Sequence, residues 1–145
     1  VMFISDFWTF ILEAENEYSV YKKRIMAEFS LTKAETDIVM FLYNNSEFDT
    51  AAKVSKIRKI PKSQVSVSVN SLSDKGFLKC KKCDDNKKSI HLSLTEKGIE
   101  AARFGKAVQQ EFGDSLFYGF SDSEKKAFET LHMKMLDNIK KGRDK

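Results

Sequence analysis

Apolar residues recur at steps of three and four along most of the chain, a spacing that predicts helices. The first predicted helix covers residues 2–29. Its apolar stripe consists of Phe3, Phe7, Phe10, Ala14, Tyr18, Tyr21 and Ile25, and is widened by Ile4, Trp8 and Ile11. A stripe this wide and aromatic exceeds what one small domain usually buries, so we expect it to form part of the core and also a subunit interface.

The segment "LTKAETDIVMFLYNN" predicts a second helix. Thr32 and Glu35 have the spacing of a capping box, in which each side chain accepts a hydrogen bond from a free backbone N–H of the first turn. We expect Ile38, Phe41 and Leu42 to face inward.

The segment "DTAAKVSKIRK" predicts a short third helix, anchored by Ala52, Val54 and Ile57. Pro61, the only proline, fits the first turn of the following helix, where its missing N–H costs little.

The stretch "SQVSVSV" at residues 63–69 alternates small polar and β-branched residues, which is the period of a strand. In the longer window "PKSQVSVSVNSLSDKGF", however, Val65, Val69 and Leu72 share one helical face. Gly76 follows where a helix often ends in the left-handed region. We therefore predict a fourth helix here, with packing prevailing over weak helix propensity.

Two segments that alternate apolar and polar residues, "FLKCKKC" and "SIHLSLT", predict a β-hairpin closed by the loop "DDNKK". Thr95 and Glu96 then open a helix that ends within residues 113–119, with a stripe of Ala101, Phe104, Val108, Phe112 and Leu116. A last helix at residues 121–141 begins with a second capping box, Ser121 and Glu124. Its apolar stripe consists of Phe128, Leu131, Met135 and Ile139.

These elements predict a mainly α protein with a small β-hairpin: a winged helix-turn-helix flanked by long N- and C-terminal helices. The order of elements resembles the MarR (multiple-antibiotic-resistance regulator) family of transcriptional regulators over nearly the whole chain. The motifs that carry the resemblance are "LTKAE", "SQVSVSVNSLSDKGFL" and "LSLTEKG".

The resemblance implies a single domain over residues 1–145 that forms a homodimer. Residues 1–30 and 96–145 would be dimerisation helices, and residues 31–95 the DNA-binding region. It further implies a regulator, more often a repressor, that binds a pseudo-palindromic operator in double-stranded DNA. Many members release DNA when a small effector binds between the two regions. Here Trp8, Tyr18 and Phe41 could line such a space, although membership of the core is the favoured alternative.

The charge is concentrated in the middle of the chain. Residues 49–91 contain 11 Lys/Arg and 4 Asp/Glu, which gives +7 against a total of +4, so the remainder carries −3. Such a basic segment indicates a polyanion-binding surface, and the alternative is a solvated lysine-rich face. The predicted backbone and wing contacts with DNA are Lys53, Lys56, Arg58, Lys59, Asn86, Lys87 and Lys88.

Base readout is expected from the fourth helix, because the first turns of a recognition helix reach base edges. The candidates are Lys62, Ser63, Gln64, Ser66, Val67 and Asn70. Gln64 can pair with adenine and an outward Val67 can meet a thymine methyl. Contact with phosphate or water alone is an equally weighted alternative for Gln64 and Ser66.

Two positions depart from the family pattern. Wings of the family commonly carry Asp-x-Arg, whereas Asn86 and Lys88 stand at the matching positions. Lysine is a compact, strongly hydrated charge and enters the minor groove less well than arginine. The recognition helix also often has a basic residue where Val67 stands. We therefore predict an A·T-leaning site with little guanine readout.

Other chemistry has little support. Cys80 and Cys83 would face opposite sides of a strand and have only His91 nearby, which argues against a metal site. A buried cysteine is favoured over a redox switch, which Lys79, Lys81 and Lys82 would assist by lowering the thiol pKa.

No motif indicates an enzyme or a cofactor, and no apolar run is long enough to cross a membrane. The cysteine usage and the lack of a basic leader favour a reducing cytoplasm. A protein-interaction module that no longer reads DNA, and a non-specific nucleic-acid binder, remain the competing functions.

Overall fold

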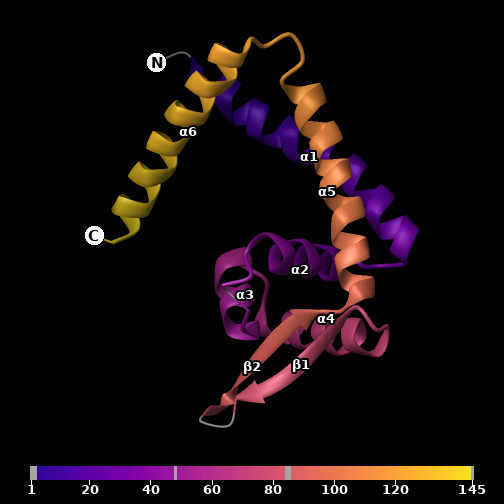
Figure 1. The fold of residues 1–145 in the computed structure, drawn as a ribbon. Coiled ribbons are helices and arrows are strands. Elements are labelled where there is room, and N and C mark those ends of the chain that lie inside the picture. The colour runs from indigo at the N-terminus through magenta and orange to yellow at the C-terminus, as the bar shows by residue number, and fades with distance from the viewer. Residues whose placement is uncertain (1–2, 48, 84–85, 145) are drawn as a thin grey trace. The chain divides into compact units, whose positions relative to one another are not determined.

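The computed structural model describes residues 3–47, 49–83 and 86–144, with side chains for all of these except 82–83 and 86–88. The elements, in chain order, are α1 (Phe3–Phe29), α2 (Lys33–Asn44), α3 (Ala51–Arg58), α4 (Lys62–Asp74), β1 (Leu78–Cys83), β2 (Asn86–Leu94), α5 (Glu96–Leu116) and α6 (Asp122–Arg143) (Figure 1). They form two compact units, Val1–Phe112 and Gly113–Lys145. The predicted order of helices and hairpin is confirmed.

The second helix begins as the sequence predicts. The Thr32 hydroxyl accepts a hydrogen bond from the Glu35 N–H at 3.1 Å, and the Glu35 carboxylate accepts one from the Thr32 N–H at 2.8 Å. Ile38, Phe41 and Leu42 are all buried. Because two orphan donors of the first turn are satisfied, α2 starts at a fixed residue and supplies the centre of the core.

Packing decides the conformation of the alternating stretch. Val65, Val69 and Leu72 lie on one face of α4 and are buried, with Leu72 fully covered. Gly76 follows the helix with φ of +85°, in the left-handed region. Pro61 is the N-cap residue, one position before the predicted one. The helical stripe therefore prevails over the strand-like alternation, as predicted.

The third helix is anchored differently from the prediction. Val54 is fully buried, but Ala52 and Ile57 are exposed, so two of the three predicted anchors are wrong. Ile60, just beyond the helix, is buried instead, and the Ser55 hydroxyl donates to the Ile60 carbonyl at 2.6 Å. A helix of eight residues has too few turns for its apolar positions to define one face.

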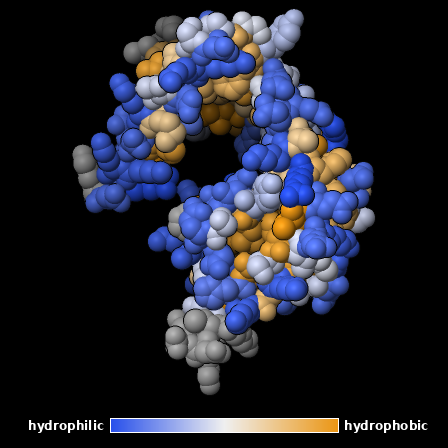
Figure 2. Space-filling model, in the orientation of Figure 1, coloured by the Kyte–Doolittle hydropathy of each residue, from blue (hydrophilic) through white to orange (hydrophobic). Residues whose placement is uncertain are grey.

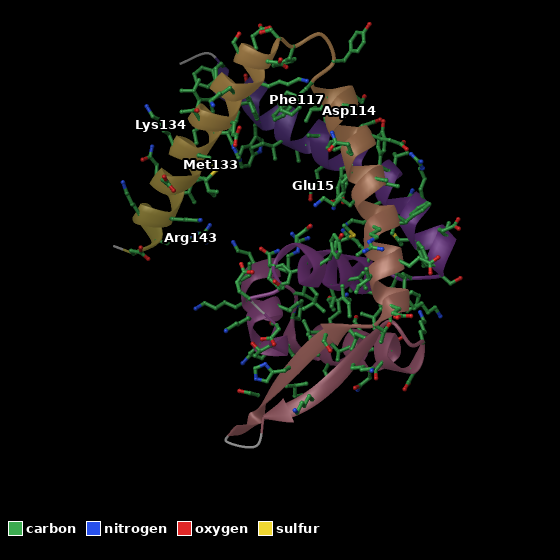
Figure 3. All side chains as sticks on the ribbon, viewed as in Figure 1. Glu15, Asp114, Phe117, Met133, Lys134 and Arg143 are labelled. Carbon is green, nitrogen blue, oxygen red and sulfur yellow. The ribbon has the colours of Figure 1, made fainter. Side chains whose placement is uncertain are left out.

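The hairpin packs against α4 and completes the core. Its antiparallel register pairs Leu78 with Leu94 and Cys80 with Leu92, and Leu78 and Leu92 are buried. The strand β2 already begins at Asn86, so residues 86–88 are strand and not loop as predicted. Figure 3 shows side chains filling the space between α2–α4 and the hairpin.

The motif "LTEKG" has a packing reason. A Cβ on Gly98 would lie 2.1 Å from the Phe77 carbonyl oxygen, so only glycine lets the start of α5 approach the backbone after α4. Thr95 links the two segments by hydrogen bonds: its hydroxyl donates to the Gly76 carbonyl at 2.6 Å and accepts from the Gly98 N–H at 3.1 Å.

Aromatic contacts join α1 to α5 within the first unit. The Phe112 ring contacts Tyr18 in a tilted arrangement and Tyr21 edge-on, with centroids 5.2 and 5.5 Å apart, and the Phe29 ring lies edge-on to Phe104 at 5.5 Å. The N-terminal part of α1 is largely uncovered, and Trp8 is 63% exposed.

The second unit is dominated by α6. The predicted Ser121–Glu124 capping box is present, but α6 has no buried residue among those described. Its stripe is open to solvent, with Leu131 57% and Ile139 56% exposed. Hydrophobic residues are visible along α6 among hydrophilic ones (Figure 2).

In the part of the chain that the structure describes, none of the helices combines the length and apolar character needed to cross a membrane.

Candidate nucleic-acid interface

The outer face of α4 carries all six predicted readout side chains. Each of them is exposed: Lys62, Ser63, Gln64, Ser66, Val67 and Asn70. Val67 is 70% exposed, although valine is usually buried. The N-cap residue Pro61 supplies no side-chain hydrogen bond to the first turn of α4. The outer face combines small polar groups, an amide and one methyl-bearing side chain, which is a chemistry suited to base edges and phosphates.

Exposed cations lie on α3 and at its C-cap, directly before α4 in the chain. The four predicted contacts of α3 and its C-cap, Lys53, Lys56, Arg58 and Lys59, are all exposed. Lys59 adopts a left-handed conformation with φ of +55°, and its N–H donates to the Ser55 carbonyl. That turn places Arg58 and Lys59 next to Gln64, since all three line a groove of about 270 Å³.

The wing is tied to the loop before α3. The Leu92 N–H donates to the Asp49 carbonyl at 2.7 Å, and His91 Nδ1 lies 2.9 Å from Asp49 Oδ2. Thr50 and His91 also form an antiparallel bridge. The hairpin is thereby held against the loop that precedes α3. This contact was not predicted, because residues 49 and 91 are far apart in the chain.

The predicted wing residues Asn86, Lys87 and Lys88 lie at the start of β2. Their side chains are outside the described residues, so their roles stay predictions.

The other end of α4 is fixed by a buried carboxylate. Lys75 Nζ donates to the Glu35 carboxylate at 3.0 and 3.2 Å and to the Ser30 carbonyl at 3.0 Å. Burial raises the pKa of Glu35, but hydrogen bonds from the Thr32 backbone, Ser71, Lys75 and the Thr32 side chain outweigh it and hold the pKa below its ordinary value. Glu35 therefore stays ionised and links α2 to the C-terminus of α4.

A second charged cluster joins α1, α2 and α3. The Asp37 carboxylate pairs with the Lys22 ammonium, and Arg58 Nη2 lies 3.7 Å from the same oxygen, Asp37 Oδ1. Lys22 is buried, and its ammonium also lies 5.6 Å from the centre of the Tyr18 ring. Neither Lys22 nor Asp37 was predicted, because a charged residue adds nothing to an apolar stripe.

The predicted effector residues are only partly brought together. Tyr18 and Phe41 line a cavity of about 390 Å³, together with Asp37, Arg58 and Gln109. The Gln109 amide donates to the Tyr18 hydroxyl at 2.8 Å. Trp8 does not line this cavity.

The expectation that one of the two cysteines is buried is tested only for Cys80, because the side chain of Cys83 lies outside the described residues. Cys80 is exposed, and desolvation by its protein neighbours raises the pKa of its thiol, against a lowering by a hydrogen bond with Ser73. The neighbouring lysines do not produce the predicted lowering. Among the described residues, no group of three or more His, Cys, Asp or Glu side chains could hold a metal ion.

The fold, and not the sequence, relates this chain to known proteins. No family model matches the chain, and no curated protein matches it in sequence. Solved structures do. A MarR transcriptional regulator from Methanosarcina mazei Go1 matches with a TM-score of 0.78 and 20% identity, over 94% of this chain and 98% of that one.

Two further solved structures match the chain. The S. aureus MepR–DNA complex matches with a TM-score of 0.69 and 17% identity, over 94% of this chain and 97% of that chain. Bordetella bronchiseptica BpsR, whose DNA binding is regulated by 6-hydroxynicotinic acid, matches with a TM-score of 0.69 and 17% identity, over 90% and 98%. The predicted fold, that of MarR winged-helix regulators, is confirmed.

Proposed function

We propose that this protein is a sequence-specific transcriptional regulator that binds double-stranded DNA through α4, and that it is not an enzyme. The observation that carries the proposal is the division of α4 into a buried Val65/Val69/Leu72 face and an outer face of exposed polar residues and Val67. A solvated helix gains little from an exposed valine, whereas a thymine methyl provides it with an apolar partner. The similarity to MepR, solved with DNA, supports the same use of the fold.

Affinity and specificity would come from different residues. Lys53, Lys56, Arg58, Lys59, Lys87 and Lys88 would neutralise phosphates, which makes binding depend steeply on salt. Gln64, Ser66 and Val67 would contact base edges, with Lys62, Ser63 and Asn70 at the margins. With only Arg58 of the chain's four arginines in the DNA-binding region, we propose an A·T-leaning operator.

The regulator would act as a homodimer. The exposed apolar residues of α1 and α6 are too many for a monomer and offer a surface for a second copy. A two-fold dimer presents two α4 helices, so the operator would be pseudo-palindromic. Because members of the family that the chain resembles more often repress, we propose a repressor, and we propose that it acts in the cytoplasm.

A small effector could release the DNA. The cavity lined by Tyr18 and Phe41 lies among α1, α2 and α5 and includes Arg58, a proposed phosphate contact. The regulation of BpsR by 6-hydroxynicotinic acid supports an effector in a protein of this fold.

One observation favours a second function. Ile57 and Val67 are exposed apolar residues in the helix-turn-helix region, 46% and 70% exposed. They would suit a winged-helix module that binds another protein and does not read DNA. The positive charge of residues 49–91 counts against it.

Fluorescence anisotropy with the DNA upstream of the gene, against scrambled DNA across a salt series, separates these functions. We expect tight binding to the upstream DNA alone, with affinity falling steeply as salt rises. Equal affinity for both DNAs would replace the regulator with a non-specific binder. No binding to either at low salt would favour the protein-interaction module.

A further inference from the structure

One carboxylate, Asp37 of α2, is shared by cations from two other helices. Lys22 of α1 makes the closer ion pair with Asp37 Oδ1, and Arg58 of α3 lies 3.7 Å from the same oxygen. At that distance Arg58 is attracted by the carboxylate without forming a hydrogen bond to it. The two cations therefore compete for one negative charge, and in this structure Lys22 forms the closer ion pair with it.

The pair between Lys22 and Asp37 is well protected from water. Lys22 is 9% exposed, and the Asp37 side chain is 14% exposed. A lysine buried to this degree needs a partner, because an unpaired ammonium would be strongly destabilised away from water. Lys22 thus stays near Asp37 and cancels most of the charge that would otherwise attract Arg58.

Arg58 is left with unused hydrogen-bonding capacity. Its side chain is 45% exposed, and within the described ranges the weak pair with Asp37 is its only polar contact. A guanidinium carries five N–H donors in a planar fork that matches a phosphate. Arg58 also lines the groove that contains Lys59 and Gln64, at the start of the proposed recognition helix.

We propose that Lys22 is a positioning residue for DNA binding: by neutralising Asp37, it leaves Arg58 free to bind a DNA phosphate. This inference rests on the proposed DNA-binding function. Lys22 lies in α1, so the position of that helix sets the availability of an arginine at the DNA-binding surface. If Lys22 loses its charge, Asp37 turns to Arg58 as its remaining cation, and the phosphate contact is lost.

The chain offers a matched control for the DNA measurement. Lys22→Met removes the buried cation, whereas Lys23→Met removes the same charge from the exposed neighbouring position. We expect the slope of log affinity against log salt to fall by about 1.8 in Lys22→Met, the loss of one phosphate contact in each protomer of the dimer, and to stay unchanged in Lys23→Met. The double variant Lys22→Met/Asp37→Asn removes both charges and should restore the slope. Equal slopes for Lys22→Met and the wild type, or a double variant no better than Lys22→Met, overturn the proposal.

A second double-mutant cycle tests whether Arg58 is the residue affected. Arg58→Ala alone should lower the slope by about 1.8, one phosphate contact in each protomer, and adding Lys22→Met to it should change nothing further. If Lys22→Met lowers the slope equally in both backgrounds, its effect does not pass through Arg58 and the proposal is wrong.

A measurement without DNA separates this proposal from the proposed function. An arginine-selective dicarbonyl reagent, followed by mass spectrometry, reports how freely each of the four arginines reacts. We expect Arg58 to react more slowly in Lys22→Met than in the wild type, while Arg24, which pairs with Glu111 at 2.5 Å, reacts at the same rate in both. Unchanged reactivity of Arg58 overturns the proposal even if the wild type binds DNA. Slower reactivity in a protein that binds no DNA shows instead that the proposed function has failed, and its DNA step with it.

Discussion

The helix-turn-helix region and α6 have similar patterns in the sequence but opposite fates in the structure. Both show apolar stripes at helical spacing and both begin a helix with a capping box. In α2 and α4 the stripe is buried, whereas every described residue of α6 remains at least partly exposed. A stripe thus predicts that a helix has an apolar face, and the surrounding chain decides whether that face is covered within one molecule.

The largest expected effect comes from a matched pair of leucines, one in each region. Leu72→Ala should lower the free energy of unfolding by about 2–5 kcal/mol, because it opens a cavity in a fully packed site. Leu131→Ala should lower the free energy of unfolding only at protein concentrations where two copies associate, because Leu131 is exposed in a single copy of the chain. Urea unfolding at several protein concentrations measures both. A large cost of Leu131→Ala in dilute protein would mean that α6 is buried within the monomer.

The next effect concerns association itself. Leu131→Lys places a charge on the open stripe of α6 and should raise the dissociation constant of the dimer at least tenfold, about 1.4 kcal/mol. Glu129→Gln, at an exposed polar position of the same helix, changes the net charge by the same +1 and is the control for the change of charge. Sedimentation equilibrium gives both constants. Equal constants for Leu131→Lys and Glu129→Gln would exclude the α6 stripe from the interface.

These two regions also show what a single sequence can predict. Both capping boxes were identified from their spacing, because they are local and involve only the first turn of each helix. The fourth helix was identified despite its strand-like alternation, since three apolar residues over two turns define one face. Ala52 and Ile57 were placed wrongly, because the third helix is too short to define one.

The rest of the site depends on contacts between distant residues. The pairs Lys22–Asp37 and Glu35–Lys75 are 15 and 40 positions apart in the chain. Charged residues contribute to no apolar stripe, and their partners follow only from how the helices pack. The exposure of Cys80 could not be predicted either, because it depends on how the wing lies against α4.

A smaller expected effect is that the two capping boxes differ in how their contribution to stability depends on pH. The folded-state pKa of Glu35 is below its ordinary value of 4.5, so its contribution is present above about pH 4.5 and is lost as the pH falls through the lower folded value. Glu35→Gln keeps the capping geometry but loses the ion pair with Lys75. We expect a loss of about 1 kcal/mol at neutral pH, reduced because Lys75 is partly exposed.

The control for this effect is Glu124→Gln in the second capping box. Backbone and side-chain hydrogen bonds from Ser121 lower the pKa of Glu124 as well, but that carboxylate is solvent-exposed and has no ion-pair partner described. Thermal unfolding between pH 3 and 7 should therefore show a weaker acid dependence in Glu35→Gln than in the wild type, and little change in Glu124→Gln. An identical acid dependence in Glu35→Gln and the wild type would contradict the assignment of a lowered folded-state pKa to Glu35.

The smallest expected effect on stability lies on the outer face of α4. Gln64→Ala should change the free energy of unfolding by no more than about 0.5 kcal/mol, because Gln64 is exposed and outside the core. If Gln64 pairs with adenine, the same variant should relax the preference at one base pair of each half-site by about 1–3 kcal/mol, with the salt slope unchanged. Binding-site selection with the wild type and the variant measures this preference. A uniform loss of affinity at every position, with a lower salt slope, would instead assign Gln64 to the phosphate backbone and leave base readout to Ser66 and Val67. With either result, the buried stripe of α4 would determine stability and its outer face would determine DNA binding, so the two roles could be tested by substituting different residues of one helix.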